Sequence, residues 1–439
     1  MRYCIRNGLV ISPANNLEQK LDVLVENGVI AGLIEPGTGL PEGVETIDAR
    51  GKWVTPGLID LHVHFRDPGQ TYKEDVNTGC RAAAAGGYTT VCCMPNTKPV
   101  LDSREPLLSL DGRGRQACGV NLLPVASITK GMEGKVLTDQ KTMTSLPTRC
   151  SELTGRGIAA ISEDGKTVED TALMLQAMQL ATGFDLPVFS HAEERALSAG
   201  MMNLGRRSAE LGVPGIPAEA EELIVARDIL LAKHTGCKLH LCHISTKGSV
   251  DLIRLGKSWD VKLTAETAPH YFTLTDEVVG WKSGLAKMNP PLRSWADREA
   301  IIEGLKDGTI DAIATDHAPH SPEEKEVPLT DAAFGIVGLE TAFTLGYTEL
   351  VREGLLTPSE LIEKMSTAPA RILGLDRGII APGKAADLAI IDVEKEYVIE
   401  PSAFFSKGRN TPFGGMRVYG EVKATIVNGK VIYHDRSFD

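Results

Sequence analysis

The sequence has little cysteine and histidine, no excess of positive charge and no long hydrophobic run. Its eight cysteines form no CxxC pair, and in a chain of 439 residues this favours reduced thiols in the cytoplasm over a disulfide framework. No apolar stretch approaches the ~20 residues of a transmembrane helix, and the first residues lack the pattern of a signal peptide. The net charge of −12 argues against general binding of nucleic acids or anionic membranes, which need basic surfaces.

Both ends of the chain consist of short apolar runs broken by turn residues, which is the pattern of β-strands. Near the C-terminus, Asn428-Gly429 lies between two such runs and predicts a hairpin. Because a different pattern occupies the middle, we expect the two ends to form one small β domain from residues 1–55 and 377–439. Residues 56–376 would then form a larger domain.

Short apolar segments alternate with helical stretches through this middle part, which is typical of an α/β fold with a parallel sheet. The expected strands lie within residues 57–65, 89–96, 120–127, 157–165, 186–193, 238–246, 261–270 and 311–320. The clearest helical stretches are residues 73–86, 168–183, 218–236 and 295–308. Such strand–helix units favour a (β/α)8 TIM barrel. The alternative, an open doubly wound sheet, would need a glycine-rich phosphate loop, and no GxGxxG or GxxxxGK motif occurs in the right context.

The strongest local signal is an HxH motif in the first expected barrel strand. Because side chains alternate along a strand, His62, His64 and Arg66 are expected to share one face. Two imidazoles on one strand face can chelate a divalent ion. The motif alone is also compatible with two ordinary polar residues at the end of a strand.

Other potential metal ligands follow later expected strands. Asp164, His191, His243 and Asp316 each come directly after an apolar run. The C-terminal ends of barrel strands converge on one face, where active sites of this fold are built. The sequence therefore predicts a metal site at the mouth of the barrel.

These motifs together resemble the amidohydrolase superfamily and, within it, the class I dihydroorotases. The segments that carry the resemblance are DLHVHFRDPG (60–69), MPNTKP (94–99), SEDG (162–165), HAE (191–193), CHIST (242–246), MNPPLR (288–293), TDHAPH (315–320) and FGIVGLET (334–341). The resemblance implies a metal-dependent (β/α)8 barrel with a small β-sandwich domain built from both termini.

The resemblance also implies two divalent ions, for which zinc suits the histidine and carboxylate ligands. His62, His64 and Asp316 would hold the first ion, and His191 and His243 the second. Asp164 and a hydroxide would bridge them. Many relatives, such as hydantoinases, use a carboxylated lysine as the bridge, whereas this sequence has Asp164 at that position. Glu163 is an alternative ligand, and Lys166 is expected to be a solvated loop residue.

The implied reaction is the reversible hydrolysis of dihydroorotate to N-carbamoyl-aspartate in pyrimidine biosynthesis. Asp316 would act as the general base and, in the reverse direction, as the acid. Two alternatives stay open: a hydantoinase- or allantoinase-type cyclic amidohydrolase, and a non-catalytic partner of aspartate carbamoyltransferase. A homodimer and association with aspartate carbamoyltransferase are further expectations.

Arg66 is the candidate for binding a substrate carboxylate, because its guanidinium is a planar, bidentate donor. By resemblance the substrate-binding set comprises His64, Phe65, Arg66, Asn96, Asn289, His320, Phe334 and Gly335. The segment 321–334 is a candidate lid. The remaining histidines near the strands, His240, His270 and His317, are expected to be structural.

Overall fold

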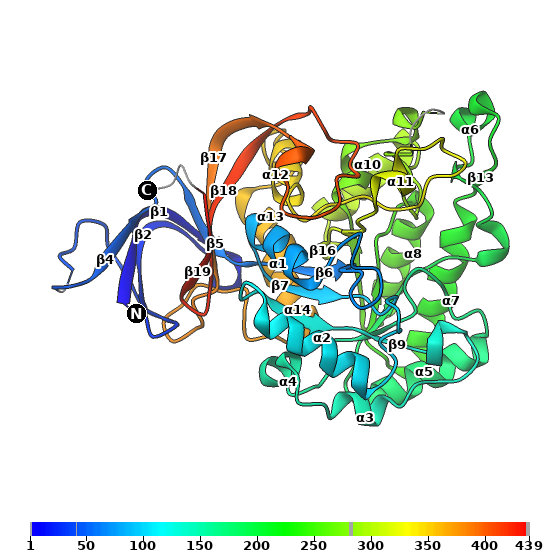
Figure 1. Cartoon of the computed structure of the whole chain (residues 1–439), viewed down its shortest axis with the longest axis horizontal. Helices are drawn as coiled ribbons and strands as arrows, with labels where there is room; N and C mark the ends of the chain where they lie inside the picture. The colour runs from blue at the N-terminus through cyan, green and yellow to red at the C-terminus, as the bar shows by residue number, and fades with distance from the viewer. Residues whose placement is uncertain (1, 41, 281–283, 436–439) are drawn as a thin grey trace.

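The computed structural model describes residues 2–40, 42–280 and 284–435 and shows two lobes (Figure 1). The larger lobe is a closed parallel barrel. Its strands are β6 (Leu58–Val63), β7 (Tyr88–Cys93), β8 (Asn121–Pro124) continued by β9 (Ala126–Ser127), β10 (Ile161–Ser162), β11 (Val188–Ser190), β14 (Leu239–Leu241), β15 (Leu263–Thr267) and β16 (Ala312–Ile313). A parallel bridge between Val63 and His317 closes the ring. The predicted TIM barrel is therefore confirmed.

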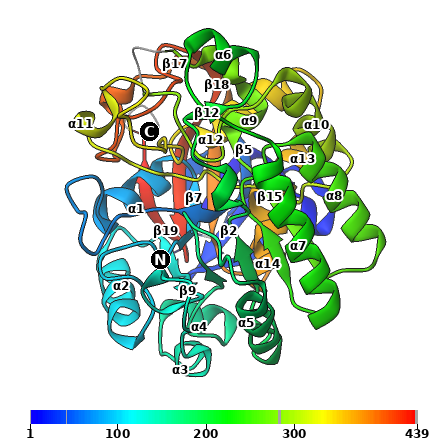
Figure 2. The ribbon, with the colours of Figure 1, turned by 90° about the vertical axis from the view of Figure 1, so that its right-hand side faces the viewer.

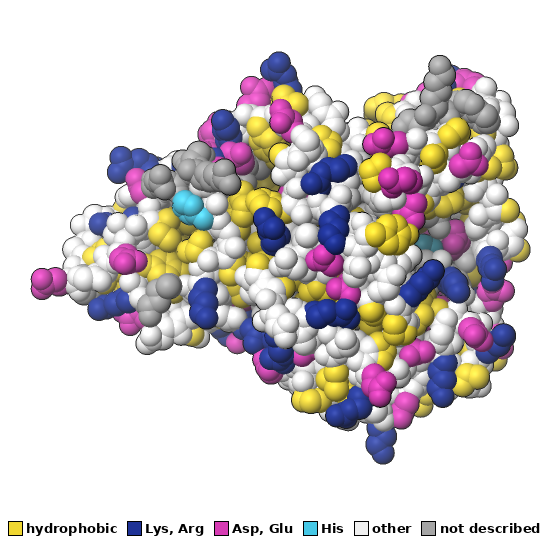
Figure 3. Space-filling model, in the orientation of Figure 1, with side chains coloured by type: hydrophobic (Ala, Val, Ile, Leu, Met, Phe, Trp, Pro, Cys, Tyr) yellow, Lys and Arg dark blue, Asp and Glu magenta, His cyan; other side chains and the backbone are white. Residues whose placement is uncertain are grey.

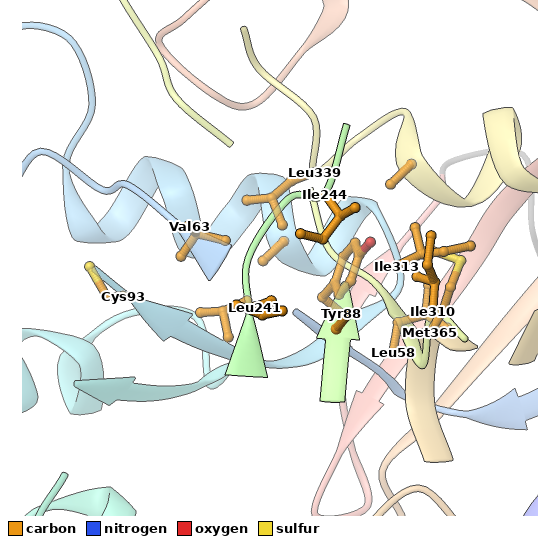
Figure 4. Packing of buried hydrophobic residues seen from close by; sticks show 14 of the residues in the cluster. Leu58, Val63, Tyr88, Cys93, Leu241, Ile244, Ile310, Ile313, Leu339 and Met365 are labelled. Atoms are coloured by element: carbon orange, nitrogen blue, oxygen red, sulfur yellow. The ribbon is translucent and has the colours of Figure 1, made fainter. Parts of the chain in front are cut away.

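The barrel strands are short and buried on both faces, which is why they appear in the sequence as continuous apolar runs. Figure 4 shows part of the apolar core around them, with Leu58, Tyr88, Ile310, Ile313 and Met365 packed together. This packing fixes the strands, and so the positions of the residues that follow them.

Helices surround the strands (Figure 2). The longest are α1 (Val76–Ala85), α2 (Arg104–Gln116), α5 (Thr171–Gly183), α7 (Glu219–Thr235), α8 (Lys247–Ser258) and α10 (Trp295–Lys306). Capping side chains mark the starts of α1 and α10: Asp75 accepts from the Thr78 amide, and Ser294 accepts from the Asp297 amide. The four helical stretches expected from the sequence thus correspond to α1, α5, α7 and α10.

The smaller lobe is a sheet in the order β19-β18-β17-β5-β1-β2-β3, with β4 added beside β1. Its strands are β1 (Arg2–Ser12), β2 (Leu17–Glu26), β3 (Val29–Ile34), β4 (Glu45–Asp48), β5 (Trp53–Pro56), β17 (Leu388–Val398), β18 (Arg417–Val427) and β19 (Lys430–His434). Apolar residues of β1–β3 and of β17–β18 pack into one core, so the two ends of the sheet fold over each other. Both termini build this lobe, as predicted.

The predicted hairpin joins β18 to β19. Asn428 and Gly429 have φ values of 47° and 73°, the left-handed backbone that a tight two-residue turn requires. The domain boundaries expected after residues 55 and 376 stay a prediction.

The helices and the charged side chains on the surface can be compared with the expectations from hydropathy and net charge. In the described ranges, no helix combines the length and apolar character needed to cross a bilayer. On the face in Figure 3, outside the grey atoms, basic and acidic side chains are interspersed over both lobes. This face therefore presents no extended basic surface for a polyanion.

Candidate metal centre

Four histidines and two aspartates meet at the C-terminal mouth of the barrel, and Asp164 lies at their centre. Its Oδ1 is 3.1 Å from His62 Nε2 and 3.4 Å from His191 Nδ1. The same oxygen is 3.6 Å from His243 Nε2, and Oδ2 is 3.4 Å from His64 Nε2. One carboxylate thus faces all four imidazoles, which is the position of a bridging ligand.

Asp316 faces the two histidines of β6. Its Oδ1 is 3.2 Å from His64 Nε2 and 3.7 Å from His62 Nε2. Among the described residues, three sets of candidate ligand atoms lie close enough together to share an ion. Two belong to the predicted centre, His62 with His64 and Asp316 and His62 with Asp164 and His243, and the third is His62 with Cys242 and Glu266. The structure therefore brings together all six predicted ligands.

The donor set fits a divalent metal ion. His62 Nε2 and Asp164 Oδ1 are buried and lie 3.1 Å apart, yet among the described residues neither makes a hydrogen bond of acceptable geometry. Buried polar atoms without partners are rare and costly. Imidazole nitrogens and carboxylate oxygens are ligands of zinc and related ions, so a bound cation would satisfy both atoms.

Electrostatics keep the aspartates in the form that binds metal. Burial by itself raises the pKa of the Asp164 carboxyl, but His62, His191 and His243 outweigh it and hold the pKa well below its usual range. Burial also opposes ionisation of Asp316, yet His64 and His62 lower its pKa. Both groups are therefore carboxylates at neutral pH.

Glu163 and Lys166, the charged neighbours of Asp164 in the sequence, make contacts away from the metal centre. Glu163 accepts a hydrogen bond from the Thr129 amide at 3.0 Å, and Lys166 Nζ donates to Met132 O at 2.9 Å. Neither side chain reaches the centre in this geometry. The contacts thus favour Asp164 over Glu163 as the bridging ligand.

Local backbone turns aim several of these side chains. Strand β6 ends at Val63, so the alternation expected from His62 to Arg66 does not continue along a strand. Instead Arg66 has φ 57°, and His243 and Asp316 have φ 36° and 48°. Left-handed backbone at residues other than glycine stores strain, and such strain concentrates at functional sites.

Arg66 and its neighbours form one side of the mouth. Arg66 Nε donates to Pro319 O at 3.2 Å, and its Nη2 lies 3.3 Å from His320 Nε2. Asn96 Oδ1 lies 2.9 Å from His64 Nδ1. Arg66 thus lies beside His320, and Asn96 beside His64.

The other predicted substrate residues are already engaged within the protein. Asn289 Nδ2 donates to Glu193 Oε1 at 2.9 Å. Phe334 O lies 2.9 Å from His320 Nε2, and the Gly335 amide donates to Lys287 O at 3.0 Å. A ligand for these groups would have to share or replace these bonds.

Phe65 contributes no side chain to the mouth. Its ring is buried, stands edge-on to His317 at 6.4 Å and lies against Gly79, where a Cβ would collide with it. Only its backbone remains a candidate for contact with substrate. His317 itself lies 3.3 Å from Glu74 and accepts from the Gly338 amide, which fits its expected structural role.

Three acidic residues around the site were not singled out from the sequence. Glu193 Oε2 lies 3.4 Å from His191 Nε2, and Glu266 Oε1 lies 3.2 Å from His62 Nδ1. Asp60 accepts from Thr315 Oγ1 at 2.6 Å, which ties β6 to the segment that carries Asp316. Glu193 and Asp60 could have been noticed, because each lies two residues from a ligand.

Comparison with known proteins gives one consistent family. Residues 53–432 match the amidohydrolase family. The chain is 48% identical over 437 residues to the dihydroorotase of Trichlorobacter lovleyi, covering 99% of this chain and 100% of that one. It is 45% identical to the dihydroorotase of Acetivibrio thermocellus, over 98% and 99% of the two chains.

Solved structures of hydantoinases share the fold. The L-hydantoinase of Arthrobacter aurescens superposes with a TM-score of 0.86 at 24% identity, covering 99% of this chain and 96% of that one. A D-hydantoinase from Bacillus sp. AR9 gives a TM-score of 0.82 at 26% identity, covering 100% and 96%. The nearly full-length match to dihydroorotases at far higher identity identifies the branch: the chain belongs to the amidohydrolase family and, within it, to the dihydroorotases.

Proposed function

We propose that the barrel mouth catalyses the reversible hydrolysis of dihydroorotate to N-carbamoyl-aspartate, a reaction of pyrimidine biosynthesis. The observation that carries this proposal is the position of Asp164, which faces all four histidines where hydantoinases would use a carboxylated lysine. The full-length similarity to dihydroorotases supports the same reaction.

The proposed metal centre would hold two zinc ions. His62, His64 and Asp316 would bind one ion, His191 and His243 the other, and Asp164 would lie between them. Bound zinc would supply Lewis acidity and would lower the pKa of a water towards neutrality. The chain's own contribution is to hold the ligand atoms in place before any ion binds.

Asp316 is the proposed proton carrier. It is ionised and lies against His64, at the end of a strand whose backbone is turned to aim it into the mouth. It would accept the proton from the attacking water and deliver it to the leaving amide nitrogen. In ring closure the protonated Asp316 would act as the acid.

Arg66, Asn96 and His320 are the proposed partners of the exocyclic carboxylate of the substrate. A guanidinium can form two parallel hydrogen bonds to a carboxylate. Asn289 and the backbone of Phe334 and Gly335 would contact the ring amides, with His64 and the backbone of Phe65 beside them. The homodimer, the association with aspartate carbamoyltransferase and the cytoplasmic location stay predictions.

Metal analysis combined with substrate turnover tests the proposal. The purified protein should contain a divalent metal and should turn over dihydroorotate faster than hydantoin. Hydantoins mostly lack the exocyclic carboxylate, so Arg66 would have little to bind. Faster turnover of hydantoin would overturn the assignment, and a protein with neither metal nor activity would revive the non-catalytic alternative.

A further inference from the structure

A chain of buried polar side chains continues from the metal centre towards the other end of the barrel. His62 Nδ1 lies 3.2 Å from Glu266 Oε1, and Glu266 Oε2 lies 3.0 Å from His240 Nε2. His240 Nδ1 in turn lies 2.9 Å from Thr264 Oγ1. The side chains of His62, Glu266 and His240 are at most 1% exposed.

The donors and acceptors in this chain admit a simple assignment. An ionised carboxylate only accepts hydrogen bonds, so Glu266 requires a proton on His62 Nδ1. The 3.0 Å contact of His240 Nε2 with Glu266 Oε2 lacks hydrogen-bond geometry, but a proton on this nitrogen makes the contact electrostatically attractive. The Thr264 hydroxyl then donates to His240 Nδ1. With Nδ1 of His62 protonated, its Nε2 presents a lone pair on the side of Asp164 and Asp316.

We propose that Glu266 is a positioning residue that fixes the tautomer and the ring orientation of His62 for metal binding, and that His240 anchors Glu266. Carboxylates bonded to the far nitrogen of a ligand histidine orient the ring and make it more basic. Strand β15, on which Glu266 lies, supplies no proposed metal ligand of its own. Its contribution reaches the metal through His62.

A purely structural role is the competing explanation. A buried carboxylate must be paired, because an unpaired buried charge is strongly destabilising. On that view His62 and His240 only neutralise Glu266, and removing its charge would change stability without a specific effect on metal. The two explanations therefore differ in metal affinity.

The inference rests on the proposed metal centre, so its test starts from metal-free protein. Metal affinity would be measured by competition with a chelator, and Co²⁺ binding by visible absorption. Glu266→Gln should weaken binding about 10- to 100-fold and should alter the cobalt spectrum. Its activity should return when excess metal is supplied, which would not happen if the fold were merely damaged.

Matched variants separate the outcomes. Glu340→Gln removes a carboxylate that accepts from the Phe405 and Ser406 amides, outside the mouth, and should bind metal like the wild type. His240→Gln keeps a donor for Glu266 and should retain metal affinity, whereas His240→Leu should lose metal affinity. If Glu266→Gln does not fold, the comparison of these two variants tests the inference.

Wild-type affinity and an unchanged spectrum in Glu266→Gln would overturn the inference. Equal affinity in His240→Gln and His240→Leu would overturn the anchoring role of His240 and, if Glu266→Gln does not fold, the inference as a whole. Wild-type protein that binds no metal would instead overturn the proposed metal centre itself.

Discussion

At the scale of single residues, Asp316 has two proposed duties. It lies against the histidines of β6 as a metal ligand, and it is the proposed proton carrier of the reaction. Both duties depend on a backbone with φ 48°, which turns the side chain from the end of β16 into the mouth. A substitution can separate the two, because an amide still offers an oxygen but cannot take up a proton.

Asp316→Asn is therefore expected to retain bound metal and to lose turnover. General acid–base catalysis contributes about 10²- to 10⁴-fold to a rate, so kcat should fall by about that factor. Metal content by elemental analysis and kcat with dihydroorotate check the two halves. A kcat near that of the wild type would refute the assigned role.

Arg66 should act mainly on substrate affinity. A hydrogen bond to a charged group contributes about 1.5–3 kcal/mol, so Arg66→Met should raise KM for dihydroorotate by roughly 10- to 100-fold with little change in kcat, provided that binding is uniform along the reaction. Arg81→Met, in which an arginine stacked on Phe405 is removed, is the control. Unchanged KM and kcat would exclude Arg66 from substrate binding.

At the scale of elements, buried lysines hold the segment 321–334 in place. It contains helix α11 (Pro322–Lys325), and Lys325 Nζ donates to Lys287 O and Ala333 O, both at 2.8 Å. Lys287 Nζ donates back to Leu329 O at 2.7 Å and lies over the ring of Phe334. The candidate lid is therefore fastened over Lys287, and its motion stays a prediction.

The burial of Lys325 predicts that the free energy of unfolding depends on pH. Burial, with a smaller effect of Lys287, lowers the pKa of Lys325 to about 7. The unfolded chain keeps that proton up to the ordinary lysine pKa of about 10.4. The folded state therefore binds fewer protons between these two values, and this group favours folding increasingly as the pH rises.

Thermal unfolding of the wild type and of Lys325→Met measures the effect. The melting temperature of the wild type should rise relative to that of the variant between about pH 7 and pH 10, the window set by the two pKa values. Below pH 7 their difference should be constant. A difference that is independent of pH over the whole range would show that the burial of Lys325 does not perturb its proton affinity.

Much of the site could be predicted at this scale because the ligands follow apolar runs in a parallel fold. Parallel barrel strands all end on one face, so Asp164, His191 and His243 had to lie near the HxH motif. The turns at Arg66 and Asp316 could not be predicted, since nothing local in a non-glycine residue specifies positive φ. The hydrogen bond from the Gly335 amide to Lys287 O could not be predicted either, because it joins two loops that are distant in sequence.

The contacts of Glu266 could not be predicted from the sequence for a second physical reason. His240 lies within β14, whereas His243 follows the end of that strand. The residues that face His240 depend on the register between neighbouring strands. In the pairing of β14 with β15, His240 lies opposite Thr264. That register is a property of the closed barrel and is absent from either strand alone.

At the scale of the whole molecule, metal binding and folding should be coupled. The six ligands come from strands spread around the barrel, so the unfolded chain has no preformed site. A ligand that binds only the folded state stabilises it by about 2.7 kcal/mol when its free concentration is 100 times Kd. Removing metal with a chelator should therefore lower the melting temperature, and adding metal back should restore it.

Asp164→Asn provides the matched comparison for this experiment. It removes the charge at the centre of the histidines and should greatly reduce the response of the melting temperature to added metal. Calorimetry with and without chelator would measure both proteins. A wild-type melting temperature that does not change on chelation would contradict the coupling.

The sheet built from both ends of the chain joins segments that are far apart in the sequence. Ser366 Oγ donates to Gly57 O across 309 residues of sequence, at the place where β5 joins β17. Closing a flexible loop of that length costs about 5 kcal/mol of chain entropy. Once the barrel has folded, that entropy has already been lost, and the two halves of the sheet are held beside each other. The folded barrel thus lowers the entropy cost of joining the terminal strands into one sheet.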